Sequence, residues 1–338
     1  EQRKALIDNL ISQQEQQIRY DGAKIVENLN NYSLQTIPYL KEEAKLQVYK
    51  AHTIATSLFK KLSPVLPVQE VKSVIKEALR DIRFFSNRGY IFIDDIKGNA
   101  ILLPVQSHLE GTSLHEQQDD QGNVIIQDII DAAQNKEKQG YRQYRWYEPG
   151  NSLGMQDKIS FIKQFQPFNW VIGTGDYIEK VERDFQNKSI SLLSSLELNK
   201  SSFFIIFNKK GQFIYQTQGL SESLTEKLQD PDSVKRFITQ IQKQQGLSLA
   251  QKQREFKGTS HSFSFTDTID NWGWTLVAGY NNSEILFNAE TQSNLLKDSQ
   301  KNRMQNLLLE FSMLTGLSLL IALTVAFWLR KAFINYHN

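Results

Sequence analysis

The 338-residue chain contains no cysteine. This absence excludes disulfide bonds, thiolate metal sites and a cysteine nucleophile. The chain also lacks a GxxxxGKS or GxxxxGKT phosphate-binding loop and an HExxH zinc motif. Gly173-Thr174-Gly175 is too short for a dinucleotide-binding loop and lies inside a strand-like run. We therefore expect that this segment is not an enzyme and that it holds no cofactor.

An excess of either charge is missing as well. Lysine and arginine total 39, aspartate and glutamate total 37, and the formal net charge is +2. Without a long basic run there is no reason to expect a nucleic-acid partner. Two acidic pairs, Asp94-Asp95 and Asp119-Asp120, raise the question of a metal site, but carboxylates at such positions commonly only favour turns. We expect no metal site.

Glycine and proline are rare at the start of the chain, where Gly22 and Pro38 are the single examples in the first 60 residues. Apolar residues recur there at steps of three and four, which predicts helix over residues 1–85. The run bends or breaks near Pro38, resumes over 40–61, and ends in a short amphipathic helix over 68–85. Such a long helix suits a rigid spine or a homodimer contact; alternatively, it packs only on its own domain.

One long hydrophobic run stands near the end of the chain. Residues 307–329 read LLLEFSMLTGLSLLIALTVAFWL and carry a single charge, Glu310. A helix of that length covers roughly 35 Å, enough to cross a bilayer core of about 30 Å. Arg330 and Lys331 follow directly, and Trp328 lies at the same end, an arrangement typical of the cytoplasmic side. We predict a transmembrane helix with the preceding residues outside the cytoplasm; a buried helix of a soluble domain is the alternative.

Between these helical parts the pattern changes to strands. Residues 90–102 read as a hairpin around Gly98, and a loop-rich piece follows over 104–122. We expect a helix over 124–133 and strands over 141–147, 158–165 and 170–177. Helices before the sheet and a helix inserted within it indicate an α+β layout.

The same plan occurs a second time. After a helix over 178–198 we expect a hairpin over 203–216, a helix over 220–244, strands over 256–265 and 274–280, and a helix over 283–306. Gly98 and Gly211 each follow a lysine, and Trp170 and Trp274 each stand five residues before a glycine. Two echoes in the same order predict two sheets that arose by internal duplication.

A series of short motifs between residues 87 and 177 carries a family resemblance. In order, they are Asn87-Arg88-Gly89-Tyr90, Leu103-Pro104, Glu110-Gly111-Thr112-Ser113-Leu114, Asp120-Gln121-Gly122, Tyr144-Arg145-Trp146, Lys158-Ile159-Ser160-Phe161 and the run from Trp170 to Tyr177. Together they resemble an extracellular Cache sensor domain, most closely the double Cache module of bacterial transmembrane receptors. The resemblance covers residues 60–290 in outline.

The resemblance implies an α+β fold with a long N-terminal helix, two PAS-like antiparallel-sheet Cache modules in tandem, and a transmembrane helix after them. We expect the following division: long helix 1–60, membrane-distal module 61–185, membrane-proximal module 186–290, juxtamembrane helix 291–306, span 307–329 and the start of a cytoplasmic linker 330–338.

The resemblance also implies a periplasmic sensor in the bacterial inner membrane that regulates a histidine kinase, a diguanylate cyclase or a chemotaxis signalling domain. The residues after the span lack the proline expected early in a HAMP linker, which favours a kinase or cyclase. Because the chain begins with the polar stretch EQRKALIDNL and an exported protein needs an entry signal, we expect a signal anchor ahead of it. An anchored binding or adhesion module without an output is the alternative.

Aromatic and basic residues in the first sheet are candidates for a small-molecule site. Side chains alternate along a strand, so Tyr90 and Phe92 share one face, as do Tyr144 and Trp146. A lysine or arginine beside tyrosine hydroxyls holds a carboxylate through charge-assisted hydrogen bonds, and the resemblance implies a small organic acid or related metabolite. The candidates are Tyr90, Tyr144, Trp146 and Lys158, followed by Arg83 and Phe92.

Each candidate also has a structural interpretation. Phe92 could belong to the core, Lys158 could be a solvated residue at the start of a strand, and Arg83 could be a charge at the C-terminus of a helix. His108 and His115 fit surface positions better than ligand positions. Leu103 and Phe161 replace residues that are often His and Tyr in similar domains. Both changes remove polar groups, which argues against a classical short-chain acid and leaves a more apolar ligand, or no ligand, as alternatives.

Overall fold

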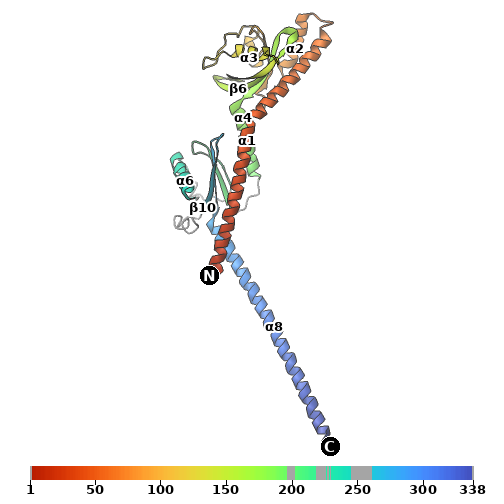
Figure 1. Ribbon diagram of the computed structural model, residues 1–338, viewed down its shortest axis with the longest axis vertical. Coiled ribbons are helices and arrows are strands. Elements are labelled where there is room, and N and C mark those ends of the chain that lie inside the picture. Colours follow the sequence, from red (N-terminus) through yellow and green to blue (C-terminus); the bar gives the residue numbers. More distant parts are fainter. Residues whose placement is uncertain are drawn as a thin grey trace. The chain divides into compact units, whose positions relative to one another are not determined.

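The computed structural model describes residues 2–195, 202–217, 226, 228, 230–244 and 261–336 (Figure 1). It has an α+β fold with a long N-terminal helix and antiparallel sheets, as the sequence predicts. Two compact units are present: one comprises Glu1–Ala23, Leu198–Asp267 and Leu276–Asn338, and the other Lys24–Glu197 and Thr268–Thr275. The finer domain boundaries expected from the sequence stay predictions.

The first helix, α1 (Gln2–Leu62), is continuous through Pro38, where the sequence allowed a bend or a break. Pro38 lies on the exposed face, so the carbonyl of Leu34, which loses its helical partner, stays open to water. Leu40 is fully buried against Ile159 on the opposite face. Packing on the buried side therefore holds the helix together across the proline.

The second helix is shorter than expected. α2 (Val68–Arg80) ends at Arg80, and β1 (Arg83–Phe84) follows it and pairs with β2 (Gly89–Tyr90). Three consecutive residues, 85–87, have positive φ angles and turn the chain back on itself. The apolar spacing of this segment predicts a longer helix, and the reversal overrides that preference.

A five-stranded sheet forms the centre of the larger unit. It consists of β3 (Phe92–Asp95), β4 (Ala100–Leu102), β5 (Gln139–Glu148), β6 (Asn151–Phe165) and β7 (Trp170–Tyr177). The strand order is β4-β3-β7-β6-β5, and all neighbouring pairs are antiparallel. β6 begins seven residues earlier than the expected strand, so Lys158 lies in its middle, between Tyr144 and Tyr177 in register.

The two faces of this sheet pack against different elements. Ile91 and Ile93 face a core shared with α1 and α2, which includes Ala51, Ile75 and Leu79. The opposite face is covered by η1 (Pro104–Leu109), the loop after it, and α3 (Ile125–Gln134). Alternation along the strand thus directs Tyr90 and Phe92 toward α3 rather than toward α1.

The second sheet repeats this plan. It contains β8 (Ser202–Phe207), β9 (Phe213–Gln216), β10 (His261–Ile269) and β11 (Trp274–Asn281) in the order β10-β11-β8-β9. Starting from the edge with the hairpin, the strand order of the second sheet is β9-β8-β11-β10. It corresponds to β4-β3-β7-β6 in the first sheet. A Cβ added at Gly175 would lie 2.0 Å from the Ile159 carbonyl oxygen, and one at Gly279 would lie 2.2 Å from that of Ser262. Both sheets therefore require glycine at the same place.

Two helices accompany the sheets, α4 (Ile178–Ser194) and α6 (Pro231–Gln244). The expected helix over 178–198 extends at its end beyond the described residues. Residues 220–229 of the helix expected over 220–244 also lie outside them, apart from 226 and 228. The same holds for residues 256–260 of the strand expected over 256–265.

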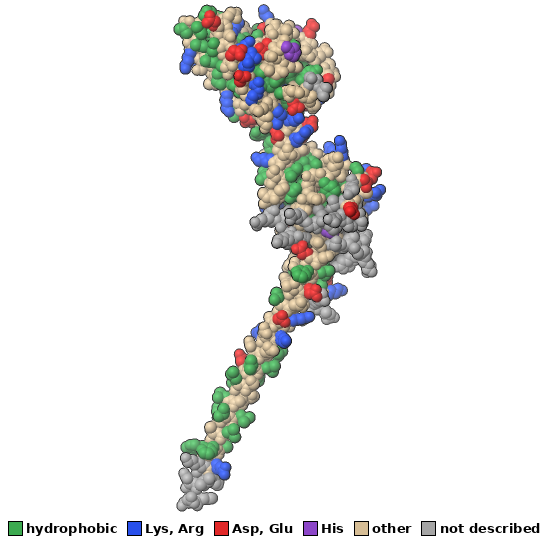
Figure 2. All heavy atoms as spheres, turned by 180° about the vertical axis from the view of Figure 1, so that it is seen from behind, with side chains coloured by type: hydrophobic (Ala, Val, Ile, Leu, Met, Phe, Trp, Pro, Cys, Tyr) green, Lys and Arg blue, Asp and Glu red, His purple; other side chains and the backbone are tan. Residues whose placement is uncertain are grey.

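The last element, α8 (Asn282–Tyr336), joins the expected juxtamembrane helix and the expected span into one helix of 55 residues. Its segment from Asn282 to Arg330 is long and apolar enough to cross a membrane, and its most hydrophobic window is 0% buried. Large apolar side chains such as Phe327 and Trp328 are exposed, and Figure 2 shows hydrophobic side chains along the rod that α8 forms. The described residues therefore do not bury this helix, and a membrane span fits these exposures better than a buried helix of a soluble domain does.

Candidate functional site

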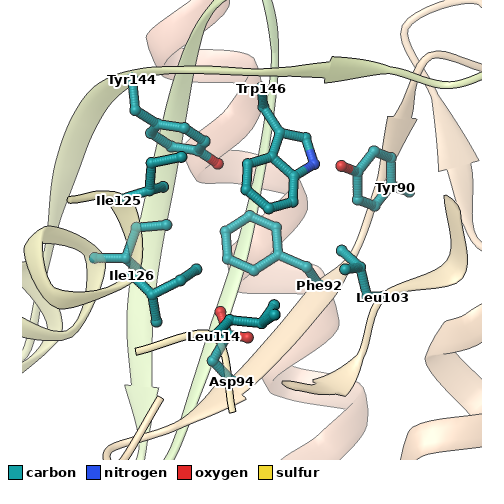
Figure 3. Close-up of a pocket in the computed structure, with 10 residues that line it drawn as sticks. Tyr90, Phe92, Asp94, Leu103, Leu114, Ile125, Ile126, Tyr144 and Trp146 are labelled. Atoms are coloured by element: carbon teal, nitrogen blue, oxygen red, sulfur yellow. The ribbon is translucent and has the colours of Figure 1, made fainter. Parts of the chain in front are cut away.

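A small cavity lies between the first sheet and α3 (Figure 3). The space that the centre of a water molecule can occupy is about 20 Å³, roughly what one water needs and well below the range of preformed small-molecule pockets, so a ligand enters only if the lining side chains move apart. Ten residues line it: Tyr90, Phe92, Asp94, Leu103, Leu114, Ile125, Ile126, Ile129, Tyr144 and Trp146. The wall is mostly apolar, with a few polar groups aimed inward, which is the composition expected of a ligand site.

Tyr144 and Trp146 reach the cavity from β5, because they are two residues apart on one face of the strand. The hydroxyl groups of Tyr144 and Ser160 are 2.9 Å apart and share a hydrogen bond. The rings of Tyr144 and Trp146 meet edge to face, with 6.4 Å between centroids. Figure 3 shows the hydroxyl of Tyr90 facing the indole nitrogen of Trp146, so polar atoms from two strands converge on one side of the cavity.

Lys158 lies behind this group and is only 1% exposed. Its Nζ donates a hydrogen bond of 3.2 Å to the hydroxyl oxygen of Tyr90 and lies 4.3 Å from the centre of that ring. The ring of Tyr177 is 5.3 Å away on another side. Burial lowers the pKa of Lys158 to about 7, although the charge of Asp176 opposes the change. Lys158 is thus a buried cation that touches the cavity through Tyr90.

A buried ion pair supports this side of the site. Asp176 on β7 is 0% exposed and accepts hydrogen bonds from Nε and Nη2 of Arg88, at 3.2 Å and 2.7 Å. Arg88 also donates to Asp184 of α4 at 2.6 Å. Burial raises the pKa of Asp176, and the hydrogen bonds from Arg88 act in the opposite direction. Arg88 thereby ties the turn before β2 to β7 and α4.

Asp94 is a cavity residue that the sequence did not identify. It is 5% exposed and lines the cavity, whereas its neighbour Asp95 accepts hydrogen bonds from the backbone of Lys97 and Asn99 in the turn. Burial, together with the charge of Asp95, raises the pKa of Asp94 to about 7. Tyr90, Phe92 and Asp94 are spaced two apart, and this alternation is the signal that places Asp94 beside the first two.

The structure brings together five of the six predicted site residues. Tyr90, Phe92, Tyr144 and Trp146 line the cavity, and Lys158 contacts Tyr90. Phe92 also belongs to the surrounding hydrophobic cluster, so its core and pocket interpretations describe the same position. Lys158 is neither solvated nor at a strand start, and that interpretation is wrong because β6 begins at residue 151.

The sixth residue, Arg83, is exposed and is not among the residues that line the cavity. We expected Arg83 to end the preceding helix, but it begins β1. Its Nη1 donates to the carbonyl oxygens of Arg80 and Ile82 at 2.7 Å and 2.9 Å. Arg83 therefore stabilises the C-terminus of α2, the role that its structural interpretation assigned to it.

The two departures from similar domains have different consequences. Leu103 lines the cavity and makes that part of its wall apolar. Phe161 packs against Ala44 and Val48 of α1, on the other face of the sheet, so its missing hydroxyl does not change the cavity. His108 and His115 are both exposed, in agreement with their assignment to the surface.

One short motif in the chain resembles an enzyme signature. Residues 150–154 read GNSLG, which matches the GxSxG pattern of serine hydrolases. In those enzymes the serine stands at a sharp turn from a strand into a helix. Here Glu148 of β5 pairs with Asn151 of β6, so the motif lies in a hairpin between two strands. The motif therefore gives no support to hydrolase chemistry.

Comparison with known proteins identifies the family. A family model described as a Cache domain, dCache_2, matches residues 1–286. The chain belongs to the Cache domain family. Cache domains are sensor domains rather than enzymes, and the family assignment agrees with the paired sheets and the cavity described above.

The curated relatives of this Cache chain are signalling proteins. The sensor histidine kinase MctS of Rhizobium johnstonii is 34% identical over 97 residues, which cover 29% of this chain and 20% of that protein. The methyl-accepting chemotaxis protein McpP of Pseudomonas putida is 29% identical over 112 residues, covering 32% and 20%. Matched parts thus span about a fifth of the length of each relative.

A solved structure titled as the basis for carboxylic acid recognition by a Cache chemosensory domain is also similar. It is 24% identical, with a TM-score of 0.39, and the match covers 42% of this chain and 95% of that one.

Proposed function

We propose that this Cache chain is the extracytoplasmic sensor region of a bacterial transmembrane receptor and that it binds a small organic acid in the cavity under α3. The cavity is small, it is lined mainly by apolar and aromatic side chains, and its hydrogen-bond donors gather on one side. This arrangement suits a ligand of a few heavy atoms that carries a hydrogen-bond acceptor at one end.

The observation that carries the proposal is the contact between Lys158 and Tyr90. Nζ of Lys158 donates to the Tyr90 hydroxyl oxygen, and the same hydroxyl also interacts with Tyr177 and Trp146, so a ligand carboxylate would take the place of one of these partners. Burial raises the pKa values of Tyr90 and Tyr144, so both hydroxyls stay protonated. Together with the indole N–H of Trp146, these groups form a set of donors backed by a buried cation, which is what a carboxylate requires.

The apolar side of the cavity would hold the carbon chain of the ligand. Ile125, Ile126 and Ile129 come from one face of α3, and Leu103 and Leu114 complete the wall. Removing a short alkyl chain from water is favourable by about 0.8 kcal/mol per methylene group. The apolar Leu103 agrees with this part of the proposal.

Signal transmission in this proposal runs through α8. Ligand binding favours one of two packings of the sensor region, limited by the difference in ligand affinity between them. The helix that follows the second sheet conveys the change to a cytoplasmic output, for which we favour a histidine kinase or a diguanylate cyclase, then a chemoreceptor. An anchored binding module without an output remains the second candidate. Placement in the inner membrane, homodimer formation and the absence of nucleic-acid partners stay predictions.

Calorimetric titration of the whole chain in lipid nanodiscs tests the ligand class. We expect at least one monocarboxylate of two to five carbons to bind, and Tyr90→Phe and Lys158→Met each to weaken that binding tenfold or more. Arg83→Ala is the matched control, because Arg83 is basic, lies near Tyr90 in register and contacts only backbone carbonyls in its hydrogen bonds. Equal affinity in all four proteins would contradict the site.

A further inference from the structure

Asp94 places an acidic group in the same cavity, away from the donors. Tyr90 and Asp94 are four residues apart along β2 and β3, which separates their Cα atoms by about 13 Å in an extended strand. Figure 3 shows Asp94 beside Leu114, with Phe92 between it and Trp146. The cavity therefore has two polar ends, one that donates hydrogen bonds and one that accepts them.

The carboxyl group of Asp94 holds no other described residue in place. Its side chain is 95% buried, given an exposure of 5%, and no hydrogen bond or ion pair from the described residues reaches it. The turn that follows is held by Asp95 instead. The oxygens of Asp94 are not among the fully buried, unpaired side-chain atoms of the described residues, so they face the cavity and a group inside it can reach them. A hydrogen-bond donor on the ligand would give this carboxyl group a partner.

We propose that the ligand is a short carboxylic acid with a hydrogen-donating group, an amine or a hydroxyl, at its other end, and that Asp94 accepts the hydrogen bond from this group. The inference rests on the proposed function, since it takes the carboxylate to lie at Tyr90 and Trp146. An unsubstituted acid would leave Asp94 facing an alkyl chain, whereas a substituted acid satisfies both ends of the cavity.

The protonation of Asp94 is compatible with either donor. Its raised pKa of about 7 means that both forms are present near neutral pH. The ionised form pairs with an ammonium group, and the protonated form still offers its carbonyl oxygen to a hydroxyl. The amine and the hydroxyl share the same contact and differ in charge, so substitution of Asp94 by a neutral isostere separates them.

The test is calorimetric titration of the whole chain in nanodiscs with butyrate, 4-hydroxybutyrate and 4-aminobutyrate, together with the three- and five-carbon analogues. At the chain length that fits, we expect a substituted acid to bind wild type at least tenfold more tightly than the unsubstituted acid. Asp94→Leu should abolish this preference and bind the unsubstituted acid at least as well as wild type does. Asp94→Asn should retain a preference for the hydroxy acid and lose one for the amino acid.

Two results overturn the inference in distinguishable ways. If unsubstituted acids bind and Asp94→Leu leaves the ratio between substituted and unsubstituted acids unchanged, Asp94 takes no part in recognition although the proposed function holds. If none of these acids binds wild type, the proposed function fails and the inference fails with it. Thermal unfolding of Asp94→Leu is the folding control, and we expect no loss of stability because a buried acidic group is replaced by an apolar one.

Discussion

The Nζ atom of Lys158 and the hydroxyl oxygen of Tyr90 are 3.2 Å apart, and the lysine is 1% exposed. No carboxylate of the described residues forms an ion pair with this ammonium group. A cation held by a neutral hydroxyl and aromatic rings loses more hydration than it regains, which explains why burial lowers the pKa of Lys158 to about 7. This one relationship leads to two measurable consequences.

The first consequence concerns stability and pH. The ordinary pKa of lysine, 10.5, applies to the unfolded chain, so between about pH 7 and pH 10.5 the unfolded state binds more protons and stability rises with pH. Lys158→Met lacks this titration. We expect the variant to be more stable than wild type at pH 6, by on the order of 4 kcal/mol, with the difference shrinking toward pH 10. Chemical unfolding followed by tryptophan fluorescence measures it; a constant difference would contradict the burial of a charged lysine.

Asp94 makes stability change with pH in the opposite direction. Its folded-state pKa of about 7 lies above the ordinary value of 3.8, so between pH 4 and pH 7 the folded state binds more protons and stability falls as pH rises. Asp94→Asn should therefore gain stability relative to wild type across this window and keep the gain above pH 7. The same unfolding measurement at pH 4, 5.5 and 7 tests the sign. A gain that appears only below pH 4 would show that Asp94 is not desolvated.

The second consequence of Lys158 is proton uptake on ligand binding. A carboxylate at Tyr90 brings a negative charge near Nζ and raises the pKa of Lys158 in the complex. At pH 8 most of the free protein has a neutral Lys158, so binding an acid should take up a sizeable fraction of one proton. Calorimetry in two buffers of different ionisation enthalpy measures this uptake. Lys158→Met serves as the control, and an equal uptake in that variant would assign the proton to another group.

Arg88 and Arg145 allow a matched comparison of two ion pairs. Arg88 pairs with Asp176, which is 0% exposed, and Arg145 pairs with Asp120, which is 47% exposed. Arg88→Ala leaves a buried carboxylate unpaired and should cost about 3 kcal/mol of stability. Arg145→Ala should cost less than about 1 kcal/mol. Thermal unfolding of both variants tests the ranking, and equal losses would mean that Asp176 is hydrated in solution.

Gly175 and Gly154 provide a second matched pair, this time for backbone packing. A Cβ at Gly175 would meet the carbonyl oxygen of Ile159 at 2.0 Å, whereas a Cβ at Gly154 meets nothing within 4 Å. Gly175→Ala must push β6 away from β7 and should lower stability by about 2 kcal/mol or more. Gly154→Ala should change it by less than about 0.5 kcal/mol. Soluble expression and unfolding midpoints of the two variants distinguish these outcomes.

The sequence predicts the donor side of the cavity because strand geometry is local. Tyr90 and Phe92 are two residues apart, as are Tyr144 and Trp146, so each pair shares a face wherever its strand forms. That the two faces meet depends on the pairing of β3, β7, β6 and β5, which the repeated pattern of the second half also indicates.

The remaining residues depend on tertiary structure. Asp94 was assigned to a turn because its neighbour Asp95 does form one, and composition cannot tell which member of an acidic pair turns inward. Lys158 lies in the middle of a long strand because β6 starts in GNSLGMQDK, a stretch whose two apolar residues, Leu153 and Met155, are too few to indicate a strand. The end of α2 depends on positive φ angles at Phe85, Ser86 and Asn87, and of these only Asn87 has a residue preference for that conformation.

The direct passage from β11 into α8 has a mechanical consequence. β11 ends at Asn281 and α8 begins at Asn282, so no loop between them absorbs a change of angle. The 49 residues from Asn282 to Arg330 form a lever arm of about 74 Å. A tilt of one degree at its base moves its far end by about 1.3 Å, which is within the 1–2 Å range of helix shifts that switch other proteins. If α8 transmits a signal as proposed, a rearrangement too small to alter the outline of the second sheet is amplified, at the far end of the helix, to the size of such helix shifts.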